Sequence, residues 1–237
     1  MALDTLSRPL AARLTRITAL PPLRNDEPDI APEVVQAAAD ALDRGETHYA
    51  DRPGIPELRA LVAERINARY GLNYKPNDVT ITCGSTEAQF CALHVLAKPE
   101  TTIICPGNAD QVAPIAALLD AVLVSSADHA PAGSLLYLTP ADAVEFWLNQ
   151  AEAGGWWVVW DLSGAPSASG LHPAARPALL PRTVHIDDLD DEMAGWRVGW
   201  MVGSEKHGEL RGFKQAMTIC TTNVSQWAAL HLLRSQS

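Results

Sequence analysis

The segment "ITCGSTEAQFCAL" (residues 81–93) gives the clearest indication of the fold. A short apolar strand pattern runs into Gly84 and Ser85, and a helical pattern of apolar residues follows directly. In parallel sheets, such strand-to-helix turns lie at the edge where ligands bind. The free amides of Ser85, Thr86 and Glu87 are suited to hold an anion at the helix N-terminus. The alternative is that the hydroxyl side chains at this turn serve only as helix caps.

On both sides of this segment, short apolar runs alternate with helical patterns. Strands that alternate with helices indicate an α/β layer with a largely parallel sheet. The expected strands are residues 78–83, 101–105, 121–126, 134–138, 156–161, 183–187 and 196–203. The expected helices begin at Pro32 and Pro56 and continue with residues 85–97, 110–119, 142–153, 208–219 and 223–233.

The composition limits the class of protein. The chain has 237 residues, of which 47% are hydrophobic, and this is enough for one sizeable core but short for two full domains. A net charge of −10 does not favour phosphate backbones or anionic membranes, so we expect neither nucleic acid nor a membrane as partner. There is no signal-peptide pattern, no apolar stretch of about 18 residues, and no CxxC pair among the four cysteines. We therefore expect a cytoplasmic protein with reduced cysteines.

The N-terminal residues are expected to form an arm that packs on the body or on a second subunit. Apolar residues recur there at helical spacing, although Pro9 interrupts the pattern. They are Leu3, Leu6, Leu10, Leu14 and Ile17. The predicted organisation is an arm over residues 1–30 and a single domain over residues 31–237.

The longer segment "GETHYADRPGIPELRALVAERINARYGLNYKPNDVTITCGSTEAQFCAL" (45–93) closely resembles the N-terminal part of the class I/II aminotransferases, which are fold-type I pyridoxal-phosphate enzymes of the aspartate aminotransferase kind. "EMAGWRVGWMVG" (192–203) resembles their segment just after the catalytic lysine, and "NVSQWAALHLL" (223–233) resembles the helix that follows. With gaps, the resemblance covers residues 20–234. It implies the family's large domain, a three-layer α/β/α sandwich in which residues 196–203 form the antiparallel strand, and a homodimer with sites between subunits.

The resemblance also implies a site for pyridoxal phosphate, to which residues of this chain can be assigned by position. The turn Gly84–Thr86 falls on the loop that cradles the cofactor phosphate, and Arg197 falls on the arginine that pairs with it. A guanidinium suits a phosphate because it offers two parallel donors. Tyr49 falls on the tyrosine that reaches the neighbouring subunit's cofactor phosphate. Asp161 falls on the aspartate that keeps the pyridine nitrogen protonated, so that the ring can act as an electron sink.

The chain departs from the family at positions that carry its chemistry. The family's lysine lies eight residues before the arginine, and that position is Leu189 here, so no amine is available for a Schiff base or a proton shift. Asp110 stands where the family stacks an aromatic ring on the cofactor, and Gly164 stands where it has a tyrosine. The "NPTG" asparagine has no clear counterpart in "YLTPADAVEF". We also expect the C-terminal domain, with its carboxylate-binding arginine, to be absent. Together these departures argue against transamination.

An acidic run, "DDLDDE" (187–192), precedes Arg197. One interpretation is a solvated loop. Another is that some of these acids surround the old cofactor pocket, which would then suit a cation or a divalent metal better than an anion. The location of Asp187 and Asp188 decides between them: if they point into the pocket, a bound anion is disfavoured, and if they point to solvent, the anion site survives.

Three hypotheses about function follow from these residues. The first is a degenerate aminotransferase-like protein that binds a phosphorylated ligand, such as pyridoxal phosphate, non-covalently and has little or no transaminase activity. The second is a cofactor-free dimeric scaffold for binding or regulation. The third is an enzyme of altered chemistry that uses an acidic pocket of Asp110, Asp161 and Asp188 with a cation or metal. No residue of the chain is assigned as catalytic.

Overall fold

A computed structural model describes residues 29–107, 109–128, 130–140, 143–164 and 170–236. The predicted arm lies outside these residues apart from its last two positions. The described helices are α2 (Pro32–Asp43), α3 (Pro56–Tyr70), α4 (Gly84–Leu96), α5 (Val112–Leu118), α6 (Val144–Gly154), α7 (His207–Thr218) and α8 (Asn223–Ser235). The strands are β1 (Val79–Thr82), β2 (Thr102–Ile104), β3 (Val122–Val124), β4 (Leu135–Leu138), β5 (Trp157–Asp161), β6 (Thr183–Asp188) and β7 (Gly199–Val202).

These strands form one sheet in the order β1-β7-β6-β5-β4-β2-β3. Strands β3, β2, β4, β5 and β6 pair in parallel, whereas β7 lies antiparallel to both β6 and β1. The predicted mostly parallel sheet is therefore confirmed, and so is the antiparallel strand expected within residues 196–203. Because β1, β5 and β6 run in the same direction, their carboxyl ends lie at one edge of the sheet. That edge is where ligands bind in open α/β sheets.

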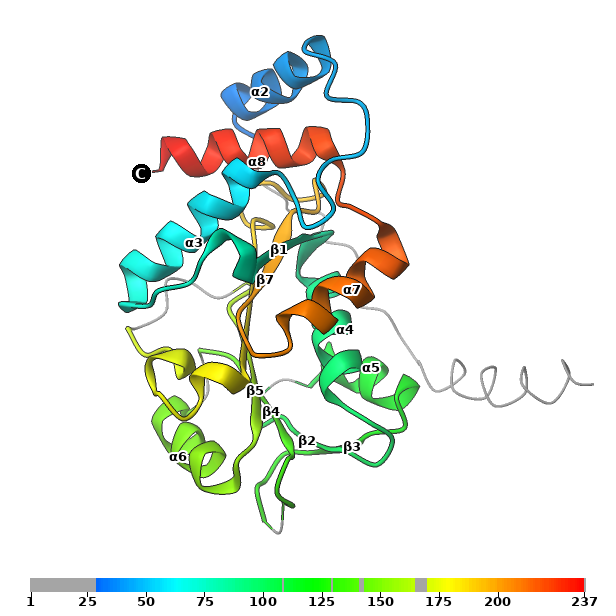
Figure 1. Cartoon of the computed structure of the whole chain (residues 1–237). Coiled ribbons are helices and arrows are strands. Elements are labelled where there is room, and N and C mark those ends of the chain that lie inside the picture. The colour runs from blue at the N-terminus through cyan, green and yellow to red at the C-terminus, as the bar shows by residue number, and fades with distance from the viewer. Residues whose placement is uncertain (1–28, 108, 129, 141–142, 165–169, 237) are drawn as a thin grey trace, which may run out of the picture.

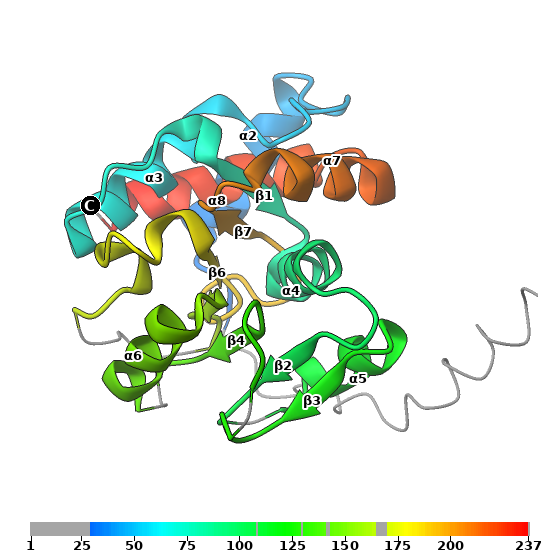
Figure 2. The same ribbon diagram turned by 60° about the horizontal axis from the view of Figure 1, so that its bottom comes forward.

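Helices cover both faces of the sheet and complete the predicted three-layer sandwich (Figures 1 and 2). One core cluster joins α4, α5 and α7 to the sheet, and the other joins α2, α3, α6 and α8 to the opposite face. The alternation along β5 shows how the sequence achieves this, because Val158 and Trp160 belong to one cluster and Val159 belongs to the other. None of the described helices is both long and apolar enough to cross a membrane.

Arg59 of α3 is a buried hydrogen-bonding centre that ties three loops together. Its Nε donates to the carbonyl oxygen of Gly54 at 3.0 Å, and its Nη1 donates to that of Pro76 at 3.1 Å. Its Nη2 lies 3.1 Å from Oδ2 of Asp51, whose side chain is half exposed. The two carbonyls depend on this one side chain for these bonds, whereas the carboxylate of Asp51 can return to water.

We expect the substitution Arg59→Met to lower the free energy of unfolding by about 2–4 kcal/mol, because it removes the guanidinium donor from the buried carbonyl of Gly54, whereas the carbonyl of Pro76 keeps the N–H of Val79. Chemical denaturation followed by circular dichroism measures this change. Arg176→Met is the matched control, since Arg176 forms its ion pairs with Glu145 and Glu152 nearer the surface. The control should cost less than about 1 kcal/mol. Equal losses in the two variants would contradict the role assigned to Arg59.

Candidate functional site

The first turn of α4 packs directly against Arg197, as the assignment of both to one site requires. Gly84 begins the helix with a φ of +71°, and a Cβ atom there would lie 2.4 Å from Nη2 of Arg197. The positive φ favours glycine at this position, and a side chain there would also displace the guanidinium group. Nη2 of Arg197 lies 3.2 Å from Oγ1 of Thr86 and 3.5 Å from the carbonyl oxygen of Cys83. The structure thus brings together the predicted turn Gly84–Thr86 and Arg197.

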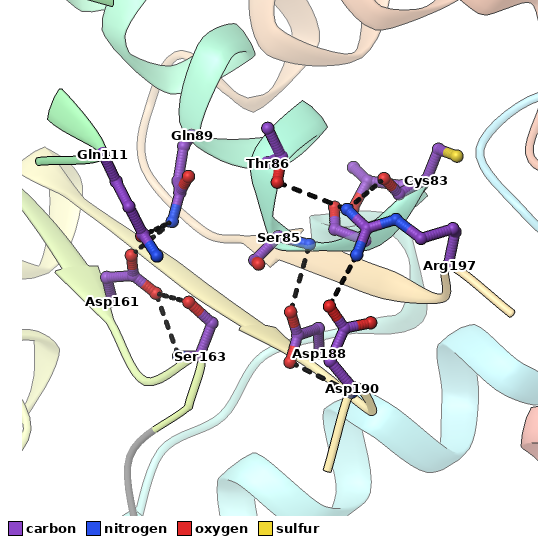
Figure 3. A network of polar contacts seen from close by, with 12 residues as sticks. Cys83, Ser85, Thr86, Gln89, Gln111, Asp161, Ser163, Asp188, Asp190 and Arg197 are labelled. Carbon is purple, nitrogen blue, oxygen red and sulfur yellow. Dashed lines mark hydrogen bonds and ion pairs between the residues drawn. The ribbon is translucent and has the colours of Figure 1, made fainter. Parts of the chain in front are cut away.

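Two carboxylates of the acidic run occupy the donors of this turn (Figure 3). The backbone N–H of Ser85 donates to Oδ2 of Asp188 at 3.3 Å. Nη1 of Arg197 donates to Oδ2 of Asp190 at 2.5 Å, and this pair is also an ion pair. Two of the donors assigned to an anion, the N–H of Ser85 and the guanidinium of Arg197, therefore already hold negative groups of the same chain.

The solvated-loop interpretation is wrong for part of the acidic run. Asp187, Asp188 and Asp190 are half-buried, whereas Asp191 and Glu192 are exposed. The inward turn is held by its own side chains, since the N–H of Asp188 donates to Oδ1 of Asp187 at 2.9 Å. The N–H of Asp190 donates in turn to Oδ1 of Asp188 at 3.2 Å. Backbone amides thus fix the first two carboxylates, and the third is held by Arg197.

A close approach of β7 to α4 positions this turn. Gly199 pairs with Asp188 across the β6–β7 ladder. A Cβ atom at position 199 would lie 2.7 Å from the carbonyl carbon of Gly84 and 2.9 Å from the nitrogen of Ser85. Because position 199 carries no side chain, the end of β6 can approach the N-terminus of α4. Asp188 is thereby brought within hydrogen-bonding distance of Ser85.

Asp161 ends β5 and lies buried on the α4 side of the sheet, only 3% exposed. Its Oδ2 accepts hydrogen bonds from Nε2 of Gln89 at 2.8 Å and from the hydroxyl of Tyr137. Its Oδ1 accepts from the N–H of Ser163 at 2.9 Å and from the hydroxyl of Ser163 at 2.7 Å. Burial raises the pKa of Asp161, and these hydrogen bonds oppose the shift. Both carboxylate oxygens are therefore already engaged by neutral donors.

Sequence reasoning missed the residues that engage Asp161. Gln89 lies four residues after Ser85 on α4, which places both on one side of the helix. It also donates to Oε1 of Gln111 at 2.7 Å. Two features of the sequence could have indicated these contacts of Asp161: the spacing between Ser85 and Gln89, and the position of Ser163 two residues after Asp161. No feature of the sequence indicated the contact between Tyr137 and Asp161, because Tyr137 lies in an ordinary strand pattern.

Two predicted site residues are not placed at this turn. Asp110 is exposed, and from the same loop it is Gln111 that reaches inward to Gln89. Tyr49 is 80% exposed and lines a separate cavity of about 440 Å³, together with residues 220–224. Its exposure leaves Tyr49 available to a second subunit, and the homodimer stays a prediction.

The third hypothesis, an acidic pocket for a metal, finds no geometric support. Asp110, Asp161 and Asp188 do not converge, because the first is exposed and the other two are engaged by separate donors. Within the ranges that the structure describes, no three side chains of His, Cys, Asp and Glu are grouped so that they could hold a metal ion.

A cavity of about 950 Å³ lies on the other face of the sheet, between α3 and the end of β6. Leu189, which the resemblance places at the lysine position, lines this cavity and belongs to the core cluster that includes α3. Asp187 also lines the cavity, and burial raises the pKa of its carboxyl to about 7. Asp188 adds a like charge that pushes the pKa in the same direction, while Arg69 opposes it.

His185 lines this cavity and forms a buried pair with His172. Nδ1 of His172 accepts from the N–H of Ala174 at 3.0 Å, and its Nε2 lies 3.0 Å from Nδ1 of His185. Burial lowers the pKa of His172 to about 3, and it lowers that of His185 well below its ordinary value, so both rings are neutral at pH 7. The hydrogen bond from Ala174 then requires the proton of His172 to be on Nε2, which donates to His185. His185 is hydrogen-bonded at Nδ1, but its buried Nε2 has no hydrogen-bond partner among the described residues.

Comparison with known proteins identifies relatives that support the resemblance. Residues 22–109 match the family model described as aminotransferase class I and II. The chain is 27% identical over 210 residues to an arginine–pyruvate transaminase of Pseudomonas aeruginosa, which covers 74% of this chain and 53% of that protein. It is 26% identical over 248 residues to an aspartate aminotransferase of Thermotoga maritima, covering 87% of this chain and 64% of that protein. The chain thus spans about half to two thirds of the length of these relatives.

The fold is also that of solved aminotransferases. The structure of an aromatic aminotransferase from Pyrococcus horikoshii superposes with a TM-score of 0.83 at 20% sequence identity, covering 95% of this chain and 70% of that one. A methionine aminotransferase from Escherichia coli superposes with a TM-score of 0.78 at 24% identity, covering 99% of this chain and 71% of that one. The chain is therefore similar in sequence to the class I and II aminotransferases over residues 22–109, and it has the fold of their large domain.

Proposed function

We propose that this aminotransferase homologue does not transaminate and instead works as a cofactor-free binding scaffold. The observation that carries the proposal is the place of Leu189. Its side chain is only 5% exposed and packs into the apolar cluster below α3, at the position where the resemblance puts the lysine. An alkyl side chain supplies neither a nucleophile nor a base for amino-group transfer.

No other lysine is placed to substitute for the missing amine. The cavity beside Leu189 has no lysine among the described residues that line it. Lys214 of α7 is fully buried, but its Nζ donates to Oγ1 of Thr221 at 3.3 Å, and that hydroxyl donates to the carbonyl oxygen of Ile81. Burial lowers the pKa of Lys214, yet these contacts hold its amine against β1 rather than in the cavity.

The residues as arranged do not fit pyridoxal phosphate. A bound phosphate would need the N–H of Ser85 and the guanidinium of Arg197, which hold Asp188 and Asp190 instead. A pyridinium would need a free oxygen of Asp161, and both of its oxygens accept hydrogen bonds from donors of the same chain. This geometry supports the cofactor-free alternative over non-covalent binding of the cofactor.

The test is to mix the chain with pyridoxal phosphate, reduce with borohydride and measure the intact mass. We expect no stoichiometric adduct, no change in the absorbance spectrum of the free aldehyde, and no amino-group transfer between amino acids and 2-oxo acids. One adduct that maps to a single lysine, or measurable transfer, would overturn the proposal.

A variant separates the missing lysine from the rest of the site. Leu189→Lys should remain inactive, because the added amine would still lack a free phosphate site and a free Asp161. Leu189→Met is the control for packing, since it keeps an apolar side chain of similar volume. Recovery of transamination by Leu189→Lys alone would show that the remainder of the site is intact.

A further inference from the structure

The first turn of α4 and Arg197 together make a positively polarised position at the sheet edge. The N-terminus of a helix carries a partial positive charge and unpaired N–H groups, and α4 is long enough for that field to develop. Arg197, whose φ is +55°, adds a full charge beside the same turn, where its guanidinium lies against Gly84. A site built in this way favours a negative group of any origin.

The chain supplies that negative group itself. Oδ2 of Asp188 accepts a hydrogen bond from the N–H of Ser85, and its Oδ1 accepts one from the N–H of Asp190 (Figure 3). Oδ2 of Asp190 accepts one from Nη1 of Arg197. The two carboxylates are thus tied into a single unit by a hydrogen bond between their own residues. When both are ionised they carry two negative charges, close to the charge of about −1.5 to −2 that a phosphate monoester carries at pH 7.

We infer that Asp188 and Asp190 are a built-in substitute for the phosphate group and that they, independently of Leu189, exclude phosphorylated ligands from this turn. Their advantage over a free anion is that they are already attached. A free phosphate loses translational and rotational freedom when it binds, whereas the carboxylates of the turn do not. The donor–carboxylate bonds are also charge-assisted and therefore strong.

The inference rests on the cofactor-free part of the proposed function and deepens it, and its own test is the binding of an anion rather than the transfer of an amino group. It predicts that removal of the two carboxylates uncovers an anion site that the parent does not offer. The variant Asp188→Ala/Asp190→Ala removes both charges and both acceptors. The variant Asp188→Asn/Asp190→Asn removes the charges but keeps similar shape, and it serves if the alanine variant does not fold.

The matched control is Asp191→Asn/Glu192→Gln, which removes the same number of charges from exposed positions of the same loop. Calorimetry with inorganic phosphate, pyridoxal phosphate and pyridoxal measures binding, after circular dichroism has verified folding. We expect no binding of phosphate to the parent or to the control at millimolar concentration. The alanine variant should bind inorganic phosphate at least about tenfold more tightly than the parent, should bind pyridoxal phosphate but not pyridoxal, and should lose this binding when Arg197→Ala is added.

Three results would overturn the inference. The first would be equal binding of phosphate by the parent and the alanine variant. The second would be a gain in affinity by the exposed control as large as that of the alanine variant, since the gain would then reflect net charge alone. The third would be the absence of phosphate binding by both folded double variants at millimolar concentration. Failure of the proposed function is recognised differently, by a covalent adduct on one lysine or by amino-group transfer in the parent.

Discussion

The substitution His172→Asn should make the free energy of unfolding less sensitive to acid. In the native protein, burial lowers the pKa of His172 to about 3, whereas an unfolded histidine titrates near 6.5. Below about pH 6.5 the unfolded chain therefore binds a proton that the native ring does not bind. Stability is lost as the pH falls through this window toward 3. Between pH 7 and pH 4 the burial of this one ring lowers the free energy of unfolding by about 3 kcal/mol.

The variant removes that ring but can keep its main acceptor. Oδ1 of asparagine can take the place of Nδ1 and accept from the N–H of Ala174. At pH 7 the variant should be less stable by about 1–3 kcal/mol, because the contacts of the ring with Tyr70 and His185 are lost. The deficit should shrink or reverse by pH 4. Urea unfolding at both pH values measures this, with exposed His231→Asn on α8 as a control that should change stability by less than about 0.5 kcal/mol. A deficit that stays constant from pH 7 to pH 4 would contradict the buried neutral ring.

The substitution Asp187→Asn should stabilise the protein at pH 8 and have little effect at pH 4. Burial raises the pKa of Asp187 to about 7, above the value near 3.9 expected for an unfolded aspartate. Between these values the native state binds a proton that the unfolded chain has lost, so stability falls as the pH rises from about 4 to 7. Above pH 7 the accumulated cost is about 2–4 kcal/mol for this half-buried group.

Asparagine removes the charge and retains an acceptor for the N–H of Asp188, which the native Oδ1 accepts at 2.9 Å. The expected gain at pH 8 is therefore not offset by the loss of that hydrogen bond. Glu192→Gln, on the exposed part of the same loop, is the control and should shift stability by less than about 0.5 kcal/mol. Equal stability of Asp187→Asn and the parent at pH 8 would mean that the carboxyl ionises without cost.

The pH effects of His172 and Asp187 have opposite signs and overlapping windows. The ring costs stability as the pH falls below about 6.5, and the carboxyl costs stability as the pH rises above about 4. In the parent, the two effects therefore partly cancel in the dependence of the free energy of unfolding on pH. Each is best measured as the difference between a variant and the parent over the same pH range.

Much of the architecture could be predicted from local pattern. Strands and helices near the expected positions follow from short apolar runs, helical spacing and stops such as Gly71, which takes the left-handed conformation at the end of α3. The likeness of residues 45–93 to the aminotransferases placed the turn at Gly84, and the likeness of residues 192–203 assigned Arg197 to it; the two lie in contact. The sequence also placed a leucine where the family has its lysine, since that required only a count of positions.

What the sequence could not determine is which groups occupy the donors of that turn. The acidic run reads equally well as a solvated loop, because its charges carry no periodicity. The contact between Ser85 and Asp188 joins residues 103 positions apart, and it exists because Gly199 lets the end of β6 approach α4. The contact between Gln89 and Asp161 joins residues 72 positions apart. The sequence by itself therefore determined the layers, the turn and the missing amine, which depend on local pattern and position. Only the tertiary structure decided that the turn is filled by carboxylates of its own chain, because a hydrogen bond depends on ångström distances between segments remote in sequence.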